Sequence, residues 1–180
     1  MLIHADRSLL LLIDLQERLV PTIPGMPDIL QHNLWLTEVA QRMNVPVAAT
    51  VQYPQKLGGL VSAFAQKLEA KQVVDKLHFS ALADGCLHRL PTWPRPQIIL
   101  TGIEAHVCVL QTALDLRALG KEVFVVAEAI GSRDPANRHL AIERLRQEGC
   151  RIVSREMVAF EWLHRAGTEV FRSVHKDFLR

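Results

Sequence analysis

The sequence has little of what marks a disulfide scaffold or a membrane protein. It holds only three cysteines in 180 residues, an odd and sparse set that argues for reduced thiols. The apolar run over residues 9–13 ends at Asp14, although a membrane helix needs about 20 apolar residues. A signal peptide has a cationic start and a cleavage site, and this sequence shows neither. We therefore expect a cytoplasmic protein with no membrane partner.

Strong charge and nucleotide-binding motifs are also missing. The formal net charge is +2 and the basic residues are scattered, so the sequence gives no reason to expect a nucleic-acid partner. No glycine-rich dinucleotide fingerprint or phosphate loop follows the first apolar run. We therefore expect no cofactor.

Short apolar runs do alternate with helical patterns along the chain, and 49% of the residues are apolar. The runs predict strands over residues 8–13, 46–51, 72–75, 97–101, 122–127 and 151–153. The helical patterns predict helices over residues 28–43, 60–70, 81–90, 108–119 and 135–148, with a mostly helical remainder. Asp28 is the expected cap of the first helix. This alternation predicts one three-layer α/β/α domain over residues 1–180, a Rossmann-like fold with a mostly parallel six-stranded sheet.

In such sheets, ligands bind outside the carboxyl ends of the strands, where the strand order reverses. The rule directs attention to Asp14, to the loop over residues 101–108 and to the loops after Val51 and Asp75. Cys108 follows the fourth strand at the predicted start of a helix, where the helix dipole lowers the pKa of a thiol. Cys108 is thus a candidate nucleophile, although a small buried hydrophobic residue would suit the same position.

Asp14 and Lys76 each end an apolar strand. Taken singly, Asp14 is better explained as an N-terminal cap or turn residue, and Lys76 as a solvated surface lysine. Taken with Cys108, they place a carboxylate, an ammonium and a thiol at the same predicted edge of the sheet.

Four ordered motifs span nearly the whole chain. They are Asp14-Leu15-Gln16; Lys76 with Phe79-Ser80; Gly102-Ile103 with Cys108-Val109, Thr112-Ala113 and Asp115; and residues 125–129 with Ser132-Arg133. In this order the motifs resemble the isochorismatase-like cysteine hydrolase superfamily, which has an isochorismatase-like fold of the kind predicted above. Gln52-Tyr53-Pro54, Leu57-Gly58 and the run from Gly102 to Ala105 are most similar to the subgroup of isochorismatase domain-containing proteins.

The resemblance implies a catalytic triad of Asp14, Lys76 and Cys108. It also implies a cis peptide bond before the nucleophile loop, at Ile103–Glu104, and backbone N–H groups around Val107 and Cys108 that bind an oxyanion. The expected reaction is hydrolysis of a small amide or related acyl compound. The Cys108 thiolate attacks the carbonyl carbon, Asp14 transfers the protons and a thioester forms.

Two departures from relatives narrow this expectation. Metal-dependent nicotinamidases carry an Asp-x-His pair after the second strand, where this chain has Gln52-Tyr53-Pro54, so we expect no metal. Isochorismatases proper lack the nucleophilic cysteine, so its presence here favours acyl chemistry over vinyl-ether hydrolysis.

The expected substrate-binding residues flank the triad on loops at the same edge. They are Gln52, Tyr53, Phe79, Glu104 and Val107. Among them, Glu104 and Gln52 would suit a polar or cationic group. His106, two residues before Cys108, is expected to be a lining or structural residue rather than a catalytic base.

Two other functions stay open: a binding or regulatory protein with a dormant site, and a redox-active thiol protein. The second requires a resolving thiol, yet Cys86 and Cys150 lie in other predicted elements. The resemblance also implies a homo-oligomer, with the helical segment from Arg155 onward as a candidate interface.

Overall fold

The computed structural model describes residues 1–83 and 85–179. In these residues one sheet has the strand order β3-β2-β1-β4-β5-β6, and all neighbouring strands are parallel. The strands are β1 (Ser8–Ile13), β2 (Val47–Gln52), β3 (Val73–Lys76), β4 (Gln97–Ile103), β5 (Glu122–Gly131) and β6 (Arg151–Val153). The six predicted strands and their parallel arrangement are confirmed.

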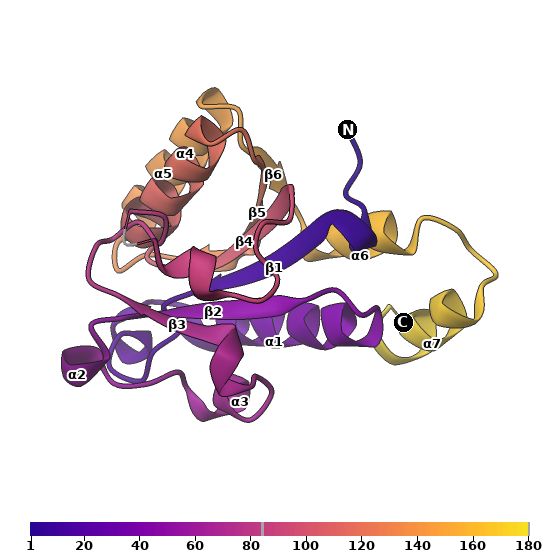
Figure 1. The fold of residues 1–180 in the computed structure, drawn as a ribbon, viewed down its shortest axis with the longest axis horizontal. Helices are drawn as coiled ribbons and strands as arrows, with labels where there is room; N and C mark the ends of the chain where they lie inside the picture. Colours follow the sequence, from indigo (N-terminus) through magenta and orange to yellow (C-terminus); the bar gives the residue numbers. More distant parts are fainter. Residues whose placement is uncertain (84, 180) are drawn as a thin grey trace.

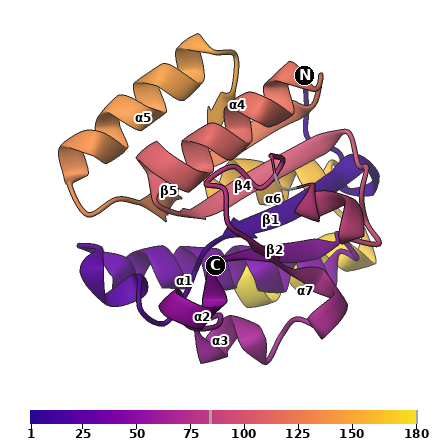
Figure 2. The ribbon, with the colours of Figure 1, turned by 60° about the vertical axis from the view of Figure 1, so that its left-hand side comes forward.

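Helices cover both faces of the sheet (Figures 1 and 2). The α-helices are α1 (Met26–Arg42), α2 (Pro54–Leu57), α3 (Ser62–Ala65), α4 (Leu110–Ala118), α5 (Pro135–Gln147), α6 (Arg155–Leu163) and α7 (Glu169–Phe178). Short 3-10 helices cover Ala5–Arg7, Val20–Thr22, Ala70–Gln72 and Cys86–Arg89, and a π-helix covers Ala105–Val109. Helices α4 and α5 lie on one face, and α1 lies on the other face, where it packs against α6 and α7. The predicted three-layer α/β/α fold is confirmed.

Strand β1 is buried on both faces, which explains its unbroken apolar sequence. Leu10 and Leu12 belong to the core shared with α1 and α6, whereas Leu9 and Leu11 belong to the core shared with α4 and α5. The polar residues that follow this strand, Asp14 and Gln16, therefore come directly after a dry sheet interior and are themselves fully buried.

The strand order reverses between β1 and β4. The chain passes from β1 to β2 and β3 on one side, and then returns to place β4 against the other side of β1. At the carboxyl ends, Ile13 of β1 is paired with Gly102 of β4. Gly102 has a φ of 107°, and a Cβ atom there would lie 2.0 Å from the carbonyl oxygen of Ile13. The two strands thus approach each other at a position that only glycine fits.

The expected helix over residues 60–70 is wrong beyond Ser62–Ala65. Leu60 instead forms an antiparallel bridge with Gln16, and the Val61 N–H donates to the carbonyl oxygen of Leu15 at 3.0 Å. Farther along, Glu69 and Gln72 form a capping box that starts a new 3-10 helix. Long-range pairing at one end and local capping at the other leave room for a single helical turn.

Three other helix predictions need correction. Helix α1 begins at Met26 with Gly25 as its N-cap, so Asp28 lies within the first turn and is not the cap. The helix predicted over residues 108–119 begins earlier, because a π-helix over Ala105–Val109 precedes α4. The helix predicted over residues 81–90 is reduced to a 3-10 helix at Cys86–Arg89, and Asp84 lies outside the described residues.

Candidate active site

Asp14 follows β1 directly and is fully buried. Its φ of 51° lies in the left-handed region, which aspartate tolerates better than most residues. One carboxylate oxygen, Oδ1, accepts a hydrogen bond from the Thr50 hydroxyl at 2.7 Å. The other, Oδ2, accepts from the Lys76 ammonium at 2.7 Å. The carboxylate is therefore held at both oxygens by β2 and β3.

Lys76 ends β3 and is 2% exposed. Besides Asp14, its ammonium donates to Oε1 of Gln52 at 2.6 Å and contacts the carbonyl oxygen of His78 at 3.4 Å. A buried ammonium is costly unless it is paired and hydrogen bonded, and here both conditions are met. The ion pair reaches across β2, because Asp14 follows β1 and Lys76 ends β3.

Gln52 is kept in place by two sets of hydrogen bonds. Its side-chain N–H donates to the carbonyl oxygen of Leu77 at 2.6 Å, while its Oε1 accepts from Lys76. Its backbone N–H and carbonyl both bond to the Gln16 amide, at 2.7 and 3.0 Å. The Gln16 side-chain amide thus pairs with the backbone of Gln52 at the end of β2 as a neighbouring strand would. This pairing is a structural role for the last residue of the Asp14-Leu15-Gln16 motif.

Cys108 lies in the π-helix, is 7% exposed and is close enough to Asp14 and Lys76 for both charges to act on its thiol. The pKa of its thiol is raised to about 12, first by burial and then by the negative charge of Asp14, while the Lys76 ammonium opposes the shift. The expectation of a lowered pKa was wrong, because burial and the neighbouring Asp14 charge outweigh any stabilisation of the thiolate by the helix start and by Lys76. The resting sulfur therefore carries a proton.

This protonation state predicts the pH behaviour of the thiol. The thiolate absorbance of the wild type minus that of Cys108→Ala should show no titration step between about pH 6 and pH 9, where an ordinary thiol with a pKa of about 8.5 ionises. The unfolded chain releases this proton near its ordinary pKa, and the folded chain releases it near pH 12. Cys108 therefore lowers stability as the pH rises between these values. A step near neutral pH in the difference titration would instead show a resting thiolate.

The turn before Cys108 contains the cis peptide bond that the resemblance implied, at Ile103–Glu104. The backbone N–H of Val107 donates to the carbonyl oxygen of Glu104 at 3.1 Å. Because this N–H already has an acceptor, an oxyanion would have to compete for it. The expected role of Val107 as an oxyanion donor is thus weakened by a bond inside the turn.

A pocket of about 240 Å³ opens at Cys108. It is lined by Leu19, Gln52, Leu57, Phe79, Glu104, Val107, Cys108 and Arg133. Four of the five expected substrate-binding residues are in this set. Tyr53 is not; it caps α2 with a φ of 39°, and its backbone N–H donates to the carbonyl oxygen of Lys76.

Three lining residues were missed by sequence reasoning: Leu19, Leu57 and Arg133. Arg133 belongs to the fourth motif, residues 125–129 with Ser132-Arg133. Its position after the fifth strand could have indicated that it lies at the ligand-binding edge of the sheet. Leu57 also lies in a quoted motif, but Leu19 is a leucine in a loop with no pattern to single it out.

Glu104 and Arg133 form a salt bridge at this pocket. The Arg133 Nε donates to both carboxylate oxygens of Glu104 at 3.0 and 3.2 Å, and the Arg133 backbone N–H donates to Oε2 at 2.8 Å. The Glu104 side chain is 12% exposed, whereas that of Arg133 is 66% exposed. The carboxylate that was expected to suit a cationic group is thus occupied by the protein's own arginine.

The remaining motif residues support the walls of the site. The Ser80 hydroxyl donates to Asp115 at 2.5 Å, and the Ala81 backbone N–H donates to the Thr112 hydroxyl at 3.0 Å. These bonds attach the segment after Phe79 to α4. His106 contacts the Ser132 hydroxyl through Nδ1 at 3.0 Å, in keeping with a structural role.

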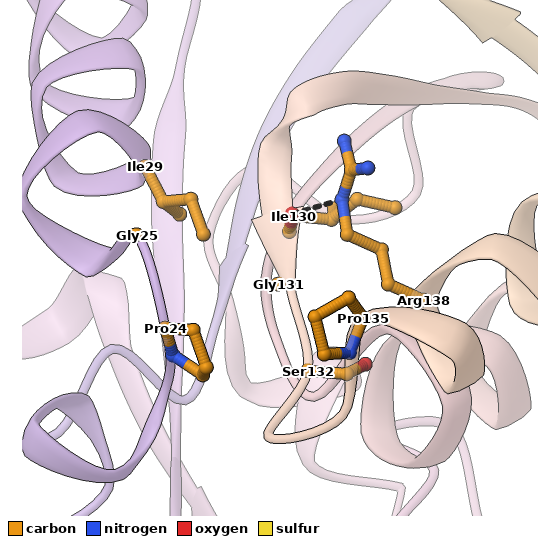
Figure 3. Close-up of a pocket in the computed structure, with 8 residues that line it drawn as sticks. All are labelled: Pro24, Gly25, Ile29, Ile130, Gly131, Ser132, Pro135 and Arg138. Carbon is orange, nitrogen blue, oxygen red and sulfur yellow. Dashed lines mark hydrogen bonds between the residues drawn. The ribbon is translucent and has the colours of Figure 1, made fainter.

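A second pocket, of about 210 Å³, lies between the starts of α1 and α5 (Figure 3). Its lining is mainly apolar, and Arg138, its charged member, donates through Nε to the carbonyl oxygen of Ile130 at 2.9 Å. None of the three predicted catalytic side chains lines it. The pocket at Cys108 is therefore the better candidate for chemistry.

Metal binding and membrane insertion are two further properties on which the described residues bear. Over residues 1–83 and 85–179, no cluster of three or more histidine, cysteine, aspartate or glutamate side chains could hold a metal ion. In the same residues, no helix combines the length and the apolar character needed to cross a membrane.

Comparisons with known proteins identify the family of this chain. The isochorismatase domain family matches residues 8–157. A secreted isochorismatase effector of Phytophthora sojae is 38% identical over 94% of this chain and 83% of its own length. Isochorismatase domain-containing protein 2 of Danio rerio is 34% identical over 94% and 85%. The solved MAR1 ribonuclease of Caenorhabditis elegans has a TM-score of 0.88 and 32% identity, covering 100% of this chain and 93% of that one.

Proposed function

Because the chain belongs to the isochorismatase family and has its hydrolase fold, we propose that it hydrolyses a small amide or related acyl compound through Asp14, Lys76 and Cys108. The observation that carries the proposal is that a buried ion pair lies close to a thiol that lines a pocket. A carboxylate that can move protons and a nucleophile that needs one removed are the two parts that covalent hydrolysis requires.

The first half-reaction starts from a protonated thiol. Asp14 takes the thiol proton as the Cys108 sulfur bonds to the substrate's carbonyl carbon, and the carbonyl oxygen becomes an oxyanion. Lys76 keeps its charge and holds the carboxylate toward the sulfur. When the tetrahedral intermediate collapses, Asp14 gives the proton to the leaving nitrogen, the carbon–nitrogen bond breaks and a thioester remains.

The second half-reaction uses the same carboxylate. Asp14 takes a proton from water as the water oxygen bonds to the thioester carbon. Collapse then breaks the carbon–sulfur bond, releases the carboxylic acid and returns the proton to the sulfur. The raised pKa of Cys108 fits this cycle, because the proton leaves the sulfur only as the sulfur bonds to carbon and returns as that bond breaks, so no free thiolate has to persist.

The decisive experiment is a panel of small amides and esters, with one RNA substrate added because a relative is named a ribonuclease. Each compound is incubated with the wild type and with Cys108→Ala, and the products and intact protein masses are measured. We expect an acyl adduct on the wild type, located at Cys108 by peptide mapping, and neither adduct nor turnover with the variant. Turnover that survives in Cys108→Ala would overturn the proposal.

The two alternative functions make different predictions in the same material. A dormant binding site would give binding without an acyl adduct or turnover. A redox function requires a disulfide, yet the three cysteines are buried and none forms a disulfide within the described residues. The intact mass after peroxide treatment would be two hydrogens lower if a disulfide formed.

The cytoplasmic location and self-association stay predictions. Size-exclusion chromatography with light scattering tests the self-association.

A further inference from the structure

Arg133 stands out among the polar groups of the Cys108 pocket because it keeps unused donors. Its Nε is committed to Glu104, but neither terminal guanidinium nitrogen donates a hydrogen bond within the described part of the chain. The side chain is two-thirds exposed and lines the pocket. A ligand in the pocket can therefore reach a fixed cation that still has hydrogen bonds to give.

The other polar lining groups are already engaged. Both ends of the Gln52 amide have partners, Lys76 and the carbonyl oxygen of Leu77. Both carboxylate oxygens of Glu104 accept from Arg133. The rest of the lining, apart from the nucleophile, is apolar: Leu19, Leu57, Phe79 and Val107. The pocket lining thus combines the Cys108 thiol, four apolar side chains and one guanidinium group with donors to spare.

The balance of charge favours an anionic ligand over a cationic one. A substrate ammonium would have to approach Glu104 beside the Arg133 cation, and this carboxylate is 12% exposed and already accepts three hydrogen bonds from that residue. A substrate carboxylate would need to displace nothing, because the terminal guanidinium nitrogens can pair with it in the planar geometry that arginine favours.

From this arrangement we propose that Arg133 binds a carboxylate at the far end of the substrate, so that the preferred substrates are short amides with a free carboxylate. This inference rests on the proposed amide hydrolysis at Cys108 and adds a substrate class to it. The pocket, at about 240 Å³, is smaller than the roughly 300–1,000 Å³ that drug-sized ligands occupy, so the chain between amide and carboxylate is short. Glu104 is a positioning residue that holds the guanidinium at the pocket.

The kinetic test compares matched substrates. Malonamate, succinamate and glutaramate are each assayed against the uncharged amide that has a methyl group in place of the carboxylate. We expect the wild type to prefer at least one charged member by about 10- to 100-fold in kcat/KM, the range that one lost charge-assisted contact represents. Arg133→Gln should bring this ratio close to one, mainly through KM, because the contact is remote from the reacting atoms. Arg146→Gln, on the exposed side of α5, is the matched control and should keep the wild-type ratio.

A binding test separates this proposal from the chemistry. In the Cys108→Ala background, where no acyl adduct can form, thermal melting is followed with each charged amide and its uncharged partner. A melting temperature raised by a charged amide alone, and no longer raised once Arg133→Gln is added, supports the proposal even if turnover has failed. Equal shifts with both partners, no shift with either, or a shift that survives Arg133→Gln overturns it. Equal turnover of both partners by the wild type overturns the carboxylate preference and leaves the hydrolase proposal standing.

Discussion

Asp14→Asn is expected to reduce kcat/KM by about 100- to 10,000-fold, the usual contribution of a general acid–base group. The asparagine amide can occupy the same space but cannot accept the Cys108 proton. The substitution also leaves the Lys76 ammonium buried with uncharged partners, Gln52 and the new amide. Breaking a buried ion pair from one side costs about 3–5 kcal/mol of stability. Both effects should appear together, in kinetics and in urea unfolding.

Two further variants separate these effects. Asp14→Asn combined with Lys76→Met removes the charge from both partners, and should regain most of the lost stability without regaining activity. Asp75→Asn is the surface control, because Asp75 lies next to Lys76 on β3 but pairs with exposed Arg89 at 3.0 Å. It should change stability by less than about 1 kcal/mol and leave turnover intact. Wild-type turnover in a folded Asp14→Asn protein would remove Asp14 from the mechanism.

Gly102→Ala is expected to destabilise the fold by about 2–6 kcal/mol. The backbone conformation at a φ of 107° accounts for about 1–3 kcal/mol of this, and crowding against a packed neighbour accounts for a similar amount. The crowding is severe because the added Cβ would lie 2.0 Å from the carbonyl oxygen of Ile13, within the β1–β4 pairing. Strand β1 would have to shift, and Asp14 would shift with it.

Gly59→Ala provides the matched control. A Cβ at Gly59 would meet no atom within 4 Å, so its effect on unfolding should stay within about 0.5 kcal/mol. Urea unfolding of the two variants and the wild type measures the difference. If Gly102→Ala unfolds at the wild-type urea concentration, β1 and β4 are not held as closely as described.

The sheet could be predicted from the sequence because its signal is local. Each apolar run is bounded by turn residues, and burial on both faces makes the run continuous, as in β1. The single turn of α3 could not be predicted, because its limits are set by the pairing of Leu60 with Gln16, which lies more than forty residues away. Local propensity over residues 60–70 gives no information about that partner.

The candidate site divides in the same way. The strand-end rule pointed to Asp14, Lys76 and Cys108, and the structure brings these three side chains together. The rule could not predict the state of the thiol, because burial depends on how the π-helix turns the sulfur into the protein. Nor could it predict that Glu104 and Gln52 already have partners, since Arg133 and Leu77 reach them only in the folded chain.

The reversal of strand order between β1 and β4 also separates two tasks in space. Asp14, the proposed proton carrier, and its supports come from the β1, β2 and β3 side, whereas the thiol and the Glu104–Arg133 pair come from loops after β4 and β5. The loop after β5 can therefore vary in sequence without disturbing the buried ion pair. With the proposed chemistry, a fold arranged this way would let related hydrolases change their substrate through the loop after β5 while the Asp14–Lys76 pair stays the same.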